Sequence, residues 1–199
     1  MRIAGLILAG GQGRRMGGAK AFAQLGGRPL IAHVHDRMAR QVQSVHISAN
    51  DDPADFAGYA DGVLHDDETG SLGPLSGILQ GLRRACRDGF THVASAPVDT
   101  PFLPANFIRR LSENGPGLVL ASSGGRLHPA CALWPVSLAD AMAAYLAGGG
   151  RRLLDFTAMS GHAIAVWRGG ANDPFFNINT PDDLAAAEMR LSKPRGKLA

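Results

Sequence analysis

The residues best suited to chemistry in this sequence lie in a glycine-rich loop near the N-terminus. The loop runs from Leu8 to Lys20 with the sequence LAGGQGRRMGGAK, and it combines five glycines with Arg14, Arg15 and Lys20. Glycine lets the backbone adopt positive φ and approach a ligand closely, and successive backbone N–H groups in such a loop form a concave anion site. The three cations add full positive charge. A loop of this kind is suited to a polyphosphate.

Spacing excludes two familiar phosphate-binding loops. A P-loop needs lysine directly after glycine, followed by Ser or Thr, but Ala19 precedes Lys20 and another alanine follows it. A dinucleotide motif G-x-G-x-x-G beginning at Gly11 would end on Met16. A plain surface loop is the remaining alternative. It does not explain why glycines and cations gather directly after the first apolar run, where open α/β sheets bind their ligands.

Asp99 is a second candidate for chemistry. It lies in the segment Ala96–Pro101, with the sequence APVDTP, directly after an apolar run. A carboxylate at the end of a strand can hold Mg²⁺, which binds phosphates through one or two carboxylates and several waters. Taken alone, a turn-forming aspartate is the better interpretation, because Asp often initiates turns. The glycine-rich loop in the same chain favours the metal site.

Two asparagines form the third candidate. Asn177 and Asn179 lie in the sequence NINTP at 177–181. Residues two apart point the same way in an extended segment, so both amides can reach one site. Thr180 and Pro181 are typical of a helix start, with Thr as the N-cap and Pro at the first position. A helix start alone does not require the two asparagines.

These motifs resemble those of a known family. LAGG-x-G-x-RMG at 8–17, followed by Lys20, resembles the signature loop of the MobA-like nucleotidyltransferases. The family also places its metal aspartate before Thr-Pro, as at Asp99, and uses N-x-N-T-P at its active site. The resemblance covers nearly the whole chain. It implies a nucleotide-diphospho-sugar transferase-like fold, Mg²⁺ on Asp99, and catalytic roles for Lys20, Arg15 and Asp99.

The resemblance also implies which residues contact the nucleotide. Family members that use GTP have Asn at the end of the second strand, but this chain has Ser48 there, with Asn50 two residues later. Base recognition is therefore expected from loop backbone, Ser48 or Asn50. For Asp66, whose neighbours are also acidic, a solvated acidic loop is a nearly equal alternative. The expected nucleotide contacts are Leu8, Ala9, Gly10, Gly11, Lys20, Ser48, Asn50, Asp66 and Asp99.

Further matching segments imply an acceptor site. RLHP at 126–129 and GRR at 150–152 resemble family segments that can bind a phosphate or a pterin. Solvated charge is an equal alternative for each of these two segments. The helix start Gly73–Gly77, with the sequence GPLSG, also matches and would place a helix N-terminus near an anionic ligand. The expected acceptor-binding residues are Asn177, Asn179, Arg126, His128 and Arg151.

The reaction implied by the resemblance is the transfer of GMP from GTP to the terminal phosphate of molybdopterin. Pyrophosphate leaves, and the guanine dinucleotide form of the cofactor results. The attacking oxygen is already ionised, so catalysis rests on positioning and charge neutralisation rather than a general base. The alternatives are a cytidylyltransferase acting on molybdopterin or a polyol phosphate, and a non-catalytic nucleotide-binding regulator. Molybdenum-cofactor biosynthesis proteins and molybdoenzyme chaperones are the expected partners.

Composition narrows the class of protein. The chain has 199 residues, of which 45% are hydrophobic and 19% charged, so disorder is not expected. A net charge of +3 does not indicate nucleic-acid binding, and the two cysteines, Cys86 and Cys131, cannot build a disulfide framework. No apolar run approaches the ~20 residues that span a bilayer, and no signal peptide is evident. We expect a cytoplasmic enzyme.

Apolar runs that alternate with amphipathic ones predict the fold class. Expected strands are 3–8, 45–49, 63–65, 92–96, 118–122, 130–134 and 163–167. Expected helices begin at Pro29, Pro74, Pro104, Val136, Arg151 and Pro181. This alternation predicts a single-domain, Rossmann-like α/β fold over 1–191, with a mostly parallel sheet and helices on both faces. The basic tail 192–199 is expected to be disordered.

Overall fold

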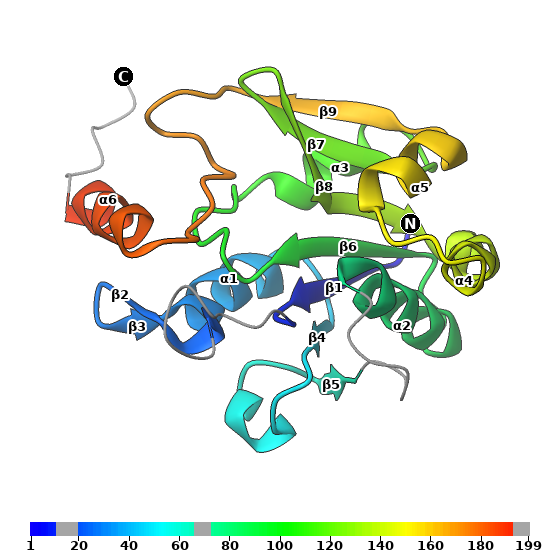
Figure 1. Ribbon diagram of the computed structural model, residues 1–199, viewed down its shortest axis with the longest axis horizontal. Coiled ribbons are helices and arrows are strands. Elements are labelled where there is room, and N and C mark those ends of the chain that lie inside the picture. Colours follow the sequence, from blue (N-terminus) through cyan, green and yellow to red (C-terminus); the bar gives the residue numbers. More distant parts are fainter. Residues whose placement is uncertain (11–19, 66–72, 193–199) are drawn as a thin grey trace.

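One mostly parallel sheet forms the centre of the molecule. The computed structural model describes residues 1–10, 20–65 and 73–192, and the remaining residues lie outside this description. Within it the sheet has the strand order β5-β4-β1-β6-β8-β7-β9 (Figure 1). Its strands are β1 (Ile3–Leu8), β4 (Val45–Ser48), β5 (Gly62–Leu64), β6 (His92–Pro97), β7 (Val119–Ser123), β8 (Arg126–Pro135) and β9 (Ala163–Trp167).

Strand register brings three strand ends together. β1 runs parallel to β4 and β6, and Leu8 at its end pairs with Ser48 of β4 and Pro97 of β6. β5 pairs in parallel with β4, and β9 pairs in parallel with β7. β8 is antiparallel to both β6 and β7. The chain therefore leaves β1, β4 and β6 at one edge of the sheet. The glycine-rich loop and Asp99 both begin there.

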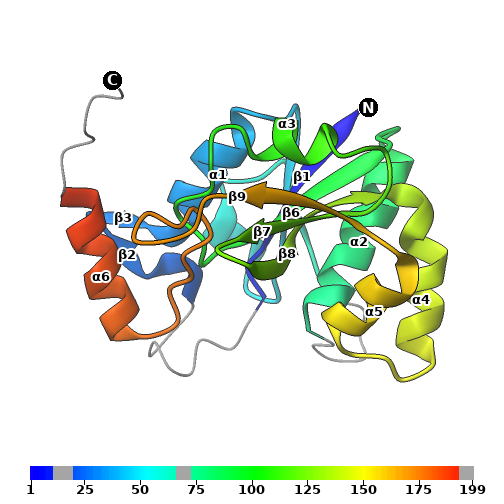
Figure 2. The same cartoon turned by 90° about the horizontal axis from the view of Figure 1, so that it is seen from above.

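Helices cover both faces of the sheet, as predicted (Figure 2). α1 (Leu30–Ala39) and α3 (Phe107–Ser112) lie on one face. α2 (Pro74–Arg87), α4 (Ala139–Ala147) and α5 (Leu153–Ser160) lie on the other. α6 (Pro181–Ser192) packs beside the small ribbon of β2 (Gln24–Leu25) and β3 (Arg28–Pro29). Short 3₁₀ turns, η1 (Lys20–Phe22), η2 (Pro53–Phe56) and η3 (Val136–Leu138), complete the described elements.

Side-chain alternation along the strands explains the two-sided core. On β1, Leu6 and Leu8 pack with α2, whereas Ile7 packs with α1. The apolar residues of α1 and α2 recur every three or four positions, which gives each helix one apolar stripe toward the sheet.

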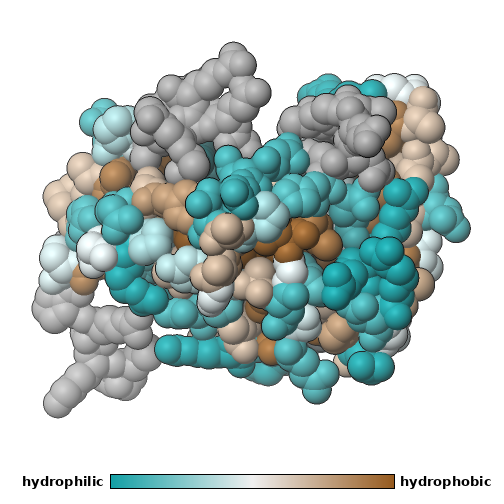
Figure 3. All heavy atoms as spheres, turned by 90° about the horizontal axis from the view of Figure 1, so that it is seen from below, coloured by the Kyte–Doolittle hydropathy of each residue, from teal (hydrophilic) through white to brown (hydrophobic). Residues whose placement is uncertain are grey.

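The outer surface seen from below is mostly hydrophilic, with small apolar areas rather than one broad one (Figure 3). Among the described residues no helix is long and apolar enough to cross a bilayer.

Some predicted boundaries differ from the structure in detail. The helix expected from Pro104 begins at Phe107, because Pro104 and its neighbours first form a turn in which the Phe107 N–H donates to the Pro104 carbonyl at 3.0 Å. Residues 126–129 belong to the long strand β8 rather than to a separate segment. α6 ends at Ser192, and residues 193–199 of the basic tail lie outside the described part.

Candidate active site

The first part of the glycine-rich loop is held between two strands. The N–H groups of Ala9 and Gly10 donate to the Ser48 carbonyl at 2.8 and 3.0 Å, and the Val98 N–H donates to the Leu8 carbonyl at 3.0 Å. These bonds continue the sheet by a residue or two beyond its last pairs. Gly11 and Arg15, which were predicted to contact the nucleotide and to act in catalysis, lie outside the described residues.

Lys20 is the centre of the described site. Its Nζ donates to Asp99 Oδ2 at 2.5 Å and to Asn179 Oδ1 at 2.6 Å. The two partners are 79 and 159 residues away in the chain. All three sequence candidates, the loop, the aspartate and the asparagines, therefore meet at one point. We call Lys20, Asp99 and Asn179 the lysine cluster.

Asp99 is fixed by its own turn and by the segment before α6. Thr100 Oγ1 donates to the Pro97 carbonyl at 2.7 Å, and the Ile178 N–H donates to the Asp99 carbonyl at 3.0 Å. Only 14% of the Asp99 side chain is exposed. Burial raises the pKa of Asp99, and its hydrogen bond and charge interaction with Lys20 oppose that rise. The ammonium group therefore compensates for a carboxylate held largely away from water.

The oxygens near Asp99 suit a hard cation. Among the described residues, Asp99 Oδ1 and Asn177 Oδ1 are buried without a hydrogen-bond partner. Carboxylate and amide oxygens are ligands that Mg²⁺ accepts, and it retains several waters or phosphate oxygens as well. The described residues contain no cluster of three or more His, Cys, Asp or Glu side chains. The donor set therefore fits a magnesium ion shared with a phosphate better than a metal enclosed by protein.

The start of α6 holds Asn179 in place. Asp183 Oδ2 accepts the N–H groups of Asn179 and Thr180, both at 2.9 Å, and Thr180 Oγ1 accepts the Asp183 N–H at 3.1 Å. This reciprocal cap satisfies the first donors of the helix. As the alternation predicts, Asn177 and Asn179 both face the Lys20–Asp99 pair: Asn179 accepts from Lys20, and the side chain of Asn177 lies close enough to lower the pKa of Asp99.

Ser48 lies under the start of α2. Its exposure is 6%, and a Cβ added to Gly77 would stand only 2.2 Å from Ser48 Oγ. Glycine at 77 therefore lets α2 approach the end of β4 directly. Asn50 follows β4 at an exposed position. Asp66, the acidic residue predicted to contact the nucleotide, lies outside the described residues.

The predicted acceptor residues are not all in one place. His128 Nε2 lies 2.8 Å from Ser123 Oγ, and its ring centre is 4.8 Å from that of Phe175, which precedes Asn177 by two residues. Arg126 begins β8 and is exposed. The Arg151 guanidinium instead donates to the carbonyls of Leu146 and Gly150, at 2.8 and 2.6 Å, at the end of α4.

Sequence reasoning missed Ser123 and Asp173, which contact each other and His128. Ser123 Oγ lies 2.8 Å from both carboxylate oxygens of Asp173. No local motif marks these residues, because they are 50 positions apart in the chain. The one available signal was alternation: Asp173 and Phe175 continue the period-two spacing of Asn177 and Asn179.

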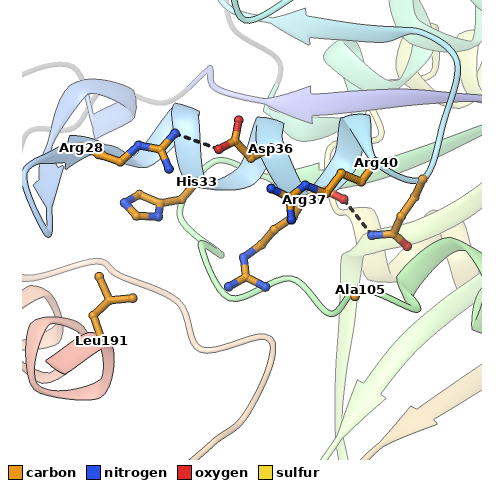
Figure 4. A pocket seen from close by; sticks show the side chains of 8 residues that line it. Arg28, His33, Asp36, Arg37, Arg40, Ala105 and Leu191 are labelled. Atoms are coloured by element: carbon orange, nitrogen blue, oxygen red, sulfur yellow. Dashed lines mark hydrogen bonds and ion pairs between the residues drawn. The ribbon is translucent and has the colours of Figure 1, made fainter. Parts of the chain in front are cut away.

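A pocket of about 340 Å³ lies elsewhere, between α1 and α6. Arg28 pairs there with Asp36 at 2.8 Å (Figure 4). Arg37 donates to the Leu103 carbonyl at 2.9 Å. The pocket holds none of the predicted site residues. It is lined by Arg28, His33, Asp36, Arg37, Arg40, Gln41, Ala105 and Leu191.

Comparisons with known proteins identify the family. The model of the MobA-like NTP transferase domain matches residues 5–164. A molybdenum cofactor guanylyltransferase of Cereibacter sphaeroides is 51% identical over 195 residues, which cover 97% of this chain and 99% of that protein. A protein of the same name from Rhodobacter capsulatus is 48% identical over 193 residues, with 96% and 97% covered.

Solved structures agree as well. Molybdopterin-guanine dinucleotide biosynthesis protein A from Archaeoglobus fulgidus superposes with a TM-score of 0.76 at 26% identity, covering 98% of this chain and 100% of that one. The 4-diphosphocytidyl-2C-methyl-D-erythritol synthase of Anaerococcus prevotii reaches a TM-score of 0.75 at 15% identity, with 96% of each chain covered, and shows the fold alone. The predicted nucleotide-diphospho-sugar transferase fold is thereby confirmed. The chain belongs to the MobA-like NTP transferase family, and its near full-length relatives there are molybdenum cofactor guanylyltransferases.

Proposed function

We propose that this chain transfers GMP from GTP to the terminal phosphate of molybdopterin. The observation that carries the proposal is the lysine cluster, which joins the three family motifs at one edge of the sheet. Relatives that match nearly the full chain are named molybdenum cofactor guanylyltransferases, which supports GTP as the nucleotide. The cytidylyltransferase alternative rests on structural neighbours at 15–19% identity, which carry the fold but not the substrate.

The reaction requires one bond to form and one to break. An ionised oxygen of the acceptor phosphate attacks the α-phosphorus of GTP, the bond from that phosphorus to the bridging oxygen breaks, and pyrophosphate leaves with the electron pair. No general base is needed, because the attacking oxygen carries no proton at neutral pH. The protein therefore contributes positioning and neutralisation of the developing charge.

Lys20 is the described cation best placed for that work. Two hydrogen bonds fix its ammonium, so little reorganisation is needed when charge develops on the phosphate oxygens. We propose that Lys20 stabilises the α-phosphate and the departing pyrophosphate, together with Arg15 from the loop. The start of α2 lies at the same edge of the sheet as Ala9 and Gly10, and a helix N-terminus favours phosphate.

Asp99 and Asn177 would hold the metal ion. Their partnerless oxygens, Asp99 Oδ1 and Asn177 Oδ1, are the donors that fit Mg²⁺, while Asp99 Oδ2 remains on Lys20. When bound, the ion supplies positive charge to the phosphate oxygens.

Proteins that make the molybdenum cofactor or chaperone molybdoenzymes are the partners we propose.

The test of the reaction uses the purified chain with Mg²⁺, molybdopterin and each nucleoside triphosphate in turn. Dinucleotide formation is followed by mass spectrometry and pyrophosphate release by a coupled assay. We expect product with GTP and little with CTP. Product with CTP alone would replace the proposal by the cytidylyltransferase, and nucleotide binding without any product would support the non-catalytic regulator.

The test of the metal site is Asp99→Asn, with Asp182→Asn as a matched control. Asp182 is an exposed acid in the first turn of α6. Loss of a hard-cation ligand should lower turnover by at least about 10²-fold and weaken Mn²⁺ binding measured by electron paramagnetic resonance. The control should change neither quantity. Normal turnover of Asp99→Asn at saturating Mg²⁺ would remove the metal assignment.

A further inference from the structure

A partly buried series of hydrogen bonds joins Ser123, Asp173 and His128, and the reaction described above assigns it no role. Its central residue is Ser123 at the end of β7, which is 1% exposed. Ser123 Oγ lies 2.8 Å from both carboxylate oxygens of Asp173 and 2.8 Å from His128 Nε2. These hydrogen bonds therefore link β7, β8 and the segment that leads from β9 to α6.

The positions of the protons follow from what each group can donate. Asp173 Oδ1 also accepts the Phe175 N–H at 2.8 Å, so this carboxylate serves as an acceptor. The single hydroxyl proton of Ser123 then points to Asp173, and Ser123 Oγ can only accept from His128. His128 must carry its proton on Nε2. Among the described residues its Nδ1 has no hydrogen-bond partner.

The electrostatics favour a neutral ring. Burial lowers the pKa of His128, the charge of Asp173 opposes this, and the nearby charge of Arg126 lowers it further. A neutral imidazole with its proton on Nε2 presents a lone pair at Nδ1. Such a group accepts a hydrogen bond from an N–H donor and has no net charge to attract a phosphate.

Asp173 also connects these hydrogen bonds to the segment that reaches the active site. Arg190 of α6 donates to the carbonyls of Asp173 and Asn172, at 2.6 and 3.1 Å, and thereby anchors the segment that carries Asn177 and Asn179. Burial raises the pKa of Cys131 of β8, and the charges of Asp99 and Asp173 act in the same direction. The ring of His128 packs against Phe175, two residues before Asn177, so His128 lies beside the segment that carries Asn177 and Asn179.

We propose that Asp173 and Ser123 are positioning residues that hold His128 in its Nε2–H form, so that Nδ1 accepts a hydrogen bond from a ring N–H of the acceptor substrate. This inference rests on the proposed function, because it takes the acceptor to be a pterin, whose heterocycle offers N–H donors. His128 then recognises the acceptor's ring rather than its phosphate.

The decisive variant is Asp173→Asn, which is nearly isosteric. Its side-chain oxygen can still accept the Phe175 N–H, but its amide donates to Ser123 Oγ. The Ser123 hydroxyl must then donate to His128 Nε2, and the ring proton moves to Nδ1. Long-range ¹H–¹⁵N NMR reads the tautomer in the free protein. We expect the Nε2–H form in the unaltered protein and the Nδ1–H form in the variant.

The kinetic readout separates the acceptor from the nucleotide. Loss of one neutral hydrogen bond corresponds to about a tenfold change, so Asp173→Asn should raise the KM for molybdopterin about tenfold and leave the KM for GTP unchanged. Ser123→Ala should act in the same direction, and Ser123→Thr, which keeps the hydroxyl, should restore the tautomer. Ser95→Ala is the matched control.

Ser95 is equally buried, at 0% exposure, and makes two hydrogen bonds of 2.8 Å, to the Ala130 carbonyl and from Trp134 Nε1. Its variant should lose stability without changing the His128 tautomer or the acceptor KM. An Nδ1–H ring in the unaltered protein would overturn the proposal, as would a tautomer change that leaves the acceptor KM unmoved. The NMR result is obtained without turnover, so it is distinct from a failure of the chain to form the dinucleotide.

Discussion

Helices α2 and α6 both begin with proline at the first position, but their N-termini are built in opposite ways. α2 follows Gly73, whose φ of 77° only glycine adopts readily, and no side chain of the described residues caps it. Its first turn contains no acidic residue. α6 follows Thr180 and is capped by its own Asp183, with Asp182 beside it in the first turn.

This difference assigns the two helix starts to different tasks. The first N–H groups of a helix and its macrodipole attract anions, unless a cap and acidic side chains occupy that end. The start of α6 is occupied, so it serves as a rigid support that places Asn179 against Lys20. No described side chain occupies the donors at the start of α2, so we expect them to bind a ligand at the sheet edge where β1 and β4 end. We therefore expect the start of α6 to position the site and the start of α2 to bind the anionic ligand.

The largest expected effect is at Lys20, which the α6 start supports through Asn179. Lys20→Ala should lower kcat by roughly 10²-fold or more, a loss of ~3 kcal/mol, with a smaller effect on the Kd for GTP. The reason is that charge on the phosphate oxygens changes during transfer, so a cation there matters most in the transition state. Steady-state kinetics and isothermal titration calorimetry provide the two quantities.

Two further variants test this prediction. Lys20→Arg should not restore full activity, because a planar guanidinium does not replace a compact ammonium between two oxygens. Arg109→Ala, which removes an exposed cation paired with Glu113, should leave both quantities unchanged. A collapse of GTP affinity with normal kcat for Lys20→Ala would mean that Lys20 only holds the nucleotide.

The next effect concerns the close approach of α2 to β4. In Gly77→Ala the new methyl group would meet Ser48 Oγ at 2.2 Å and Ser48 Cβ at 3.0 Å. Relieving that contact should displace the start of α2, lower the free energy of unfolding by about 1–3 kcal/mol and weaken GTP binding. Denaturant unfolding and calorimetry measure the two changes.

Gly81→Ala is the matched control, since its methyl group would meet Leu6 Cδ2 at 2.6 Å one turn farther along the same helix face. Both variants should lose stability, whereas only Gly77→Ala should lose GTP affinity by more than about tenfold. Equal GTP affinity in the two variants would show that the start of α2 does not contact the nucleotide.

A smaller effect is expected at the α6 cap. Asp183→Ala should lower the free energy of unfolding by about 1 kcal/mol and reduce kcat modestly, because Asn179 loses its backbone anchor. Asp182→Ala, in the same turn, should lower the free energy of unfolding by less. Hydrogen bonds from the Asn179 backbone and the Thr180 side chain lower the pKa of Asp183 below its ordinary 3.8.

The sign of the pH dependence follows from that shift. Because the folded-state pKa of Asp183 is depressed, its stabilisation is complete above about pH 4 and is lost as pH falls through the folded-state pKa. Acid unfolding of the unaltered chain and of Asp183→Ala should therefore converge at low pH. An unchanged difference in stability between them down to pH 2 would contradict the capping role.

Local motifs predicted the site because each follows a strand that ends at the same sheet edge. The sequence placed Lys20 and Asp99 at one side of the sheet, because each follows a strand. Alternation made Asn177 and Asn179 point the same way, and the family resemblance placed both of them at the site. Ser123 and Asp173 could not be placed in this way, because their contact depends on how the segment after β9 crosses the end of β7. Arg151 illustrates the reverse, since a motif match did not reveal that its guanidinium binds the carbonyls that end α4.

The smallest effect expected is at Ser48, the residue that the start of α2 covers. Its carbonyl accepts two loop N–H groups, from Ala9 and Gly10, whereas its side chain packs against Gly77 with 6% of the residue exposed. A hydroxyl in that position is poorly placed to contact a base, while the backbone bonds survive any side-chain change. Ser48→Ala should therefore alter the ratio of kcat/KM for GTP and CTP by less than about tenfold, or ~1.4 kcal/mol. Asn50→Ala, at the exposed position two residues on, is the comparison variant, because an amide there can form paired hydrogen bonds. If Ser48→Ala removes most of the GTP preference, the hydroxyl reads the base, and the α2 start must then move away from β4 when the nucleotide binds.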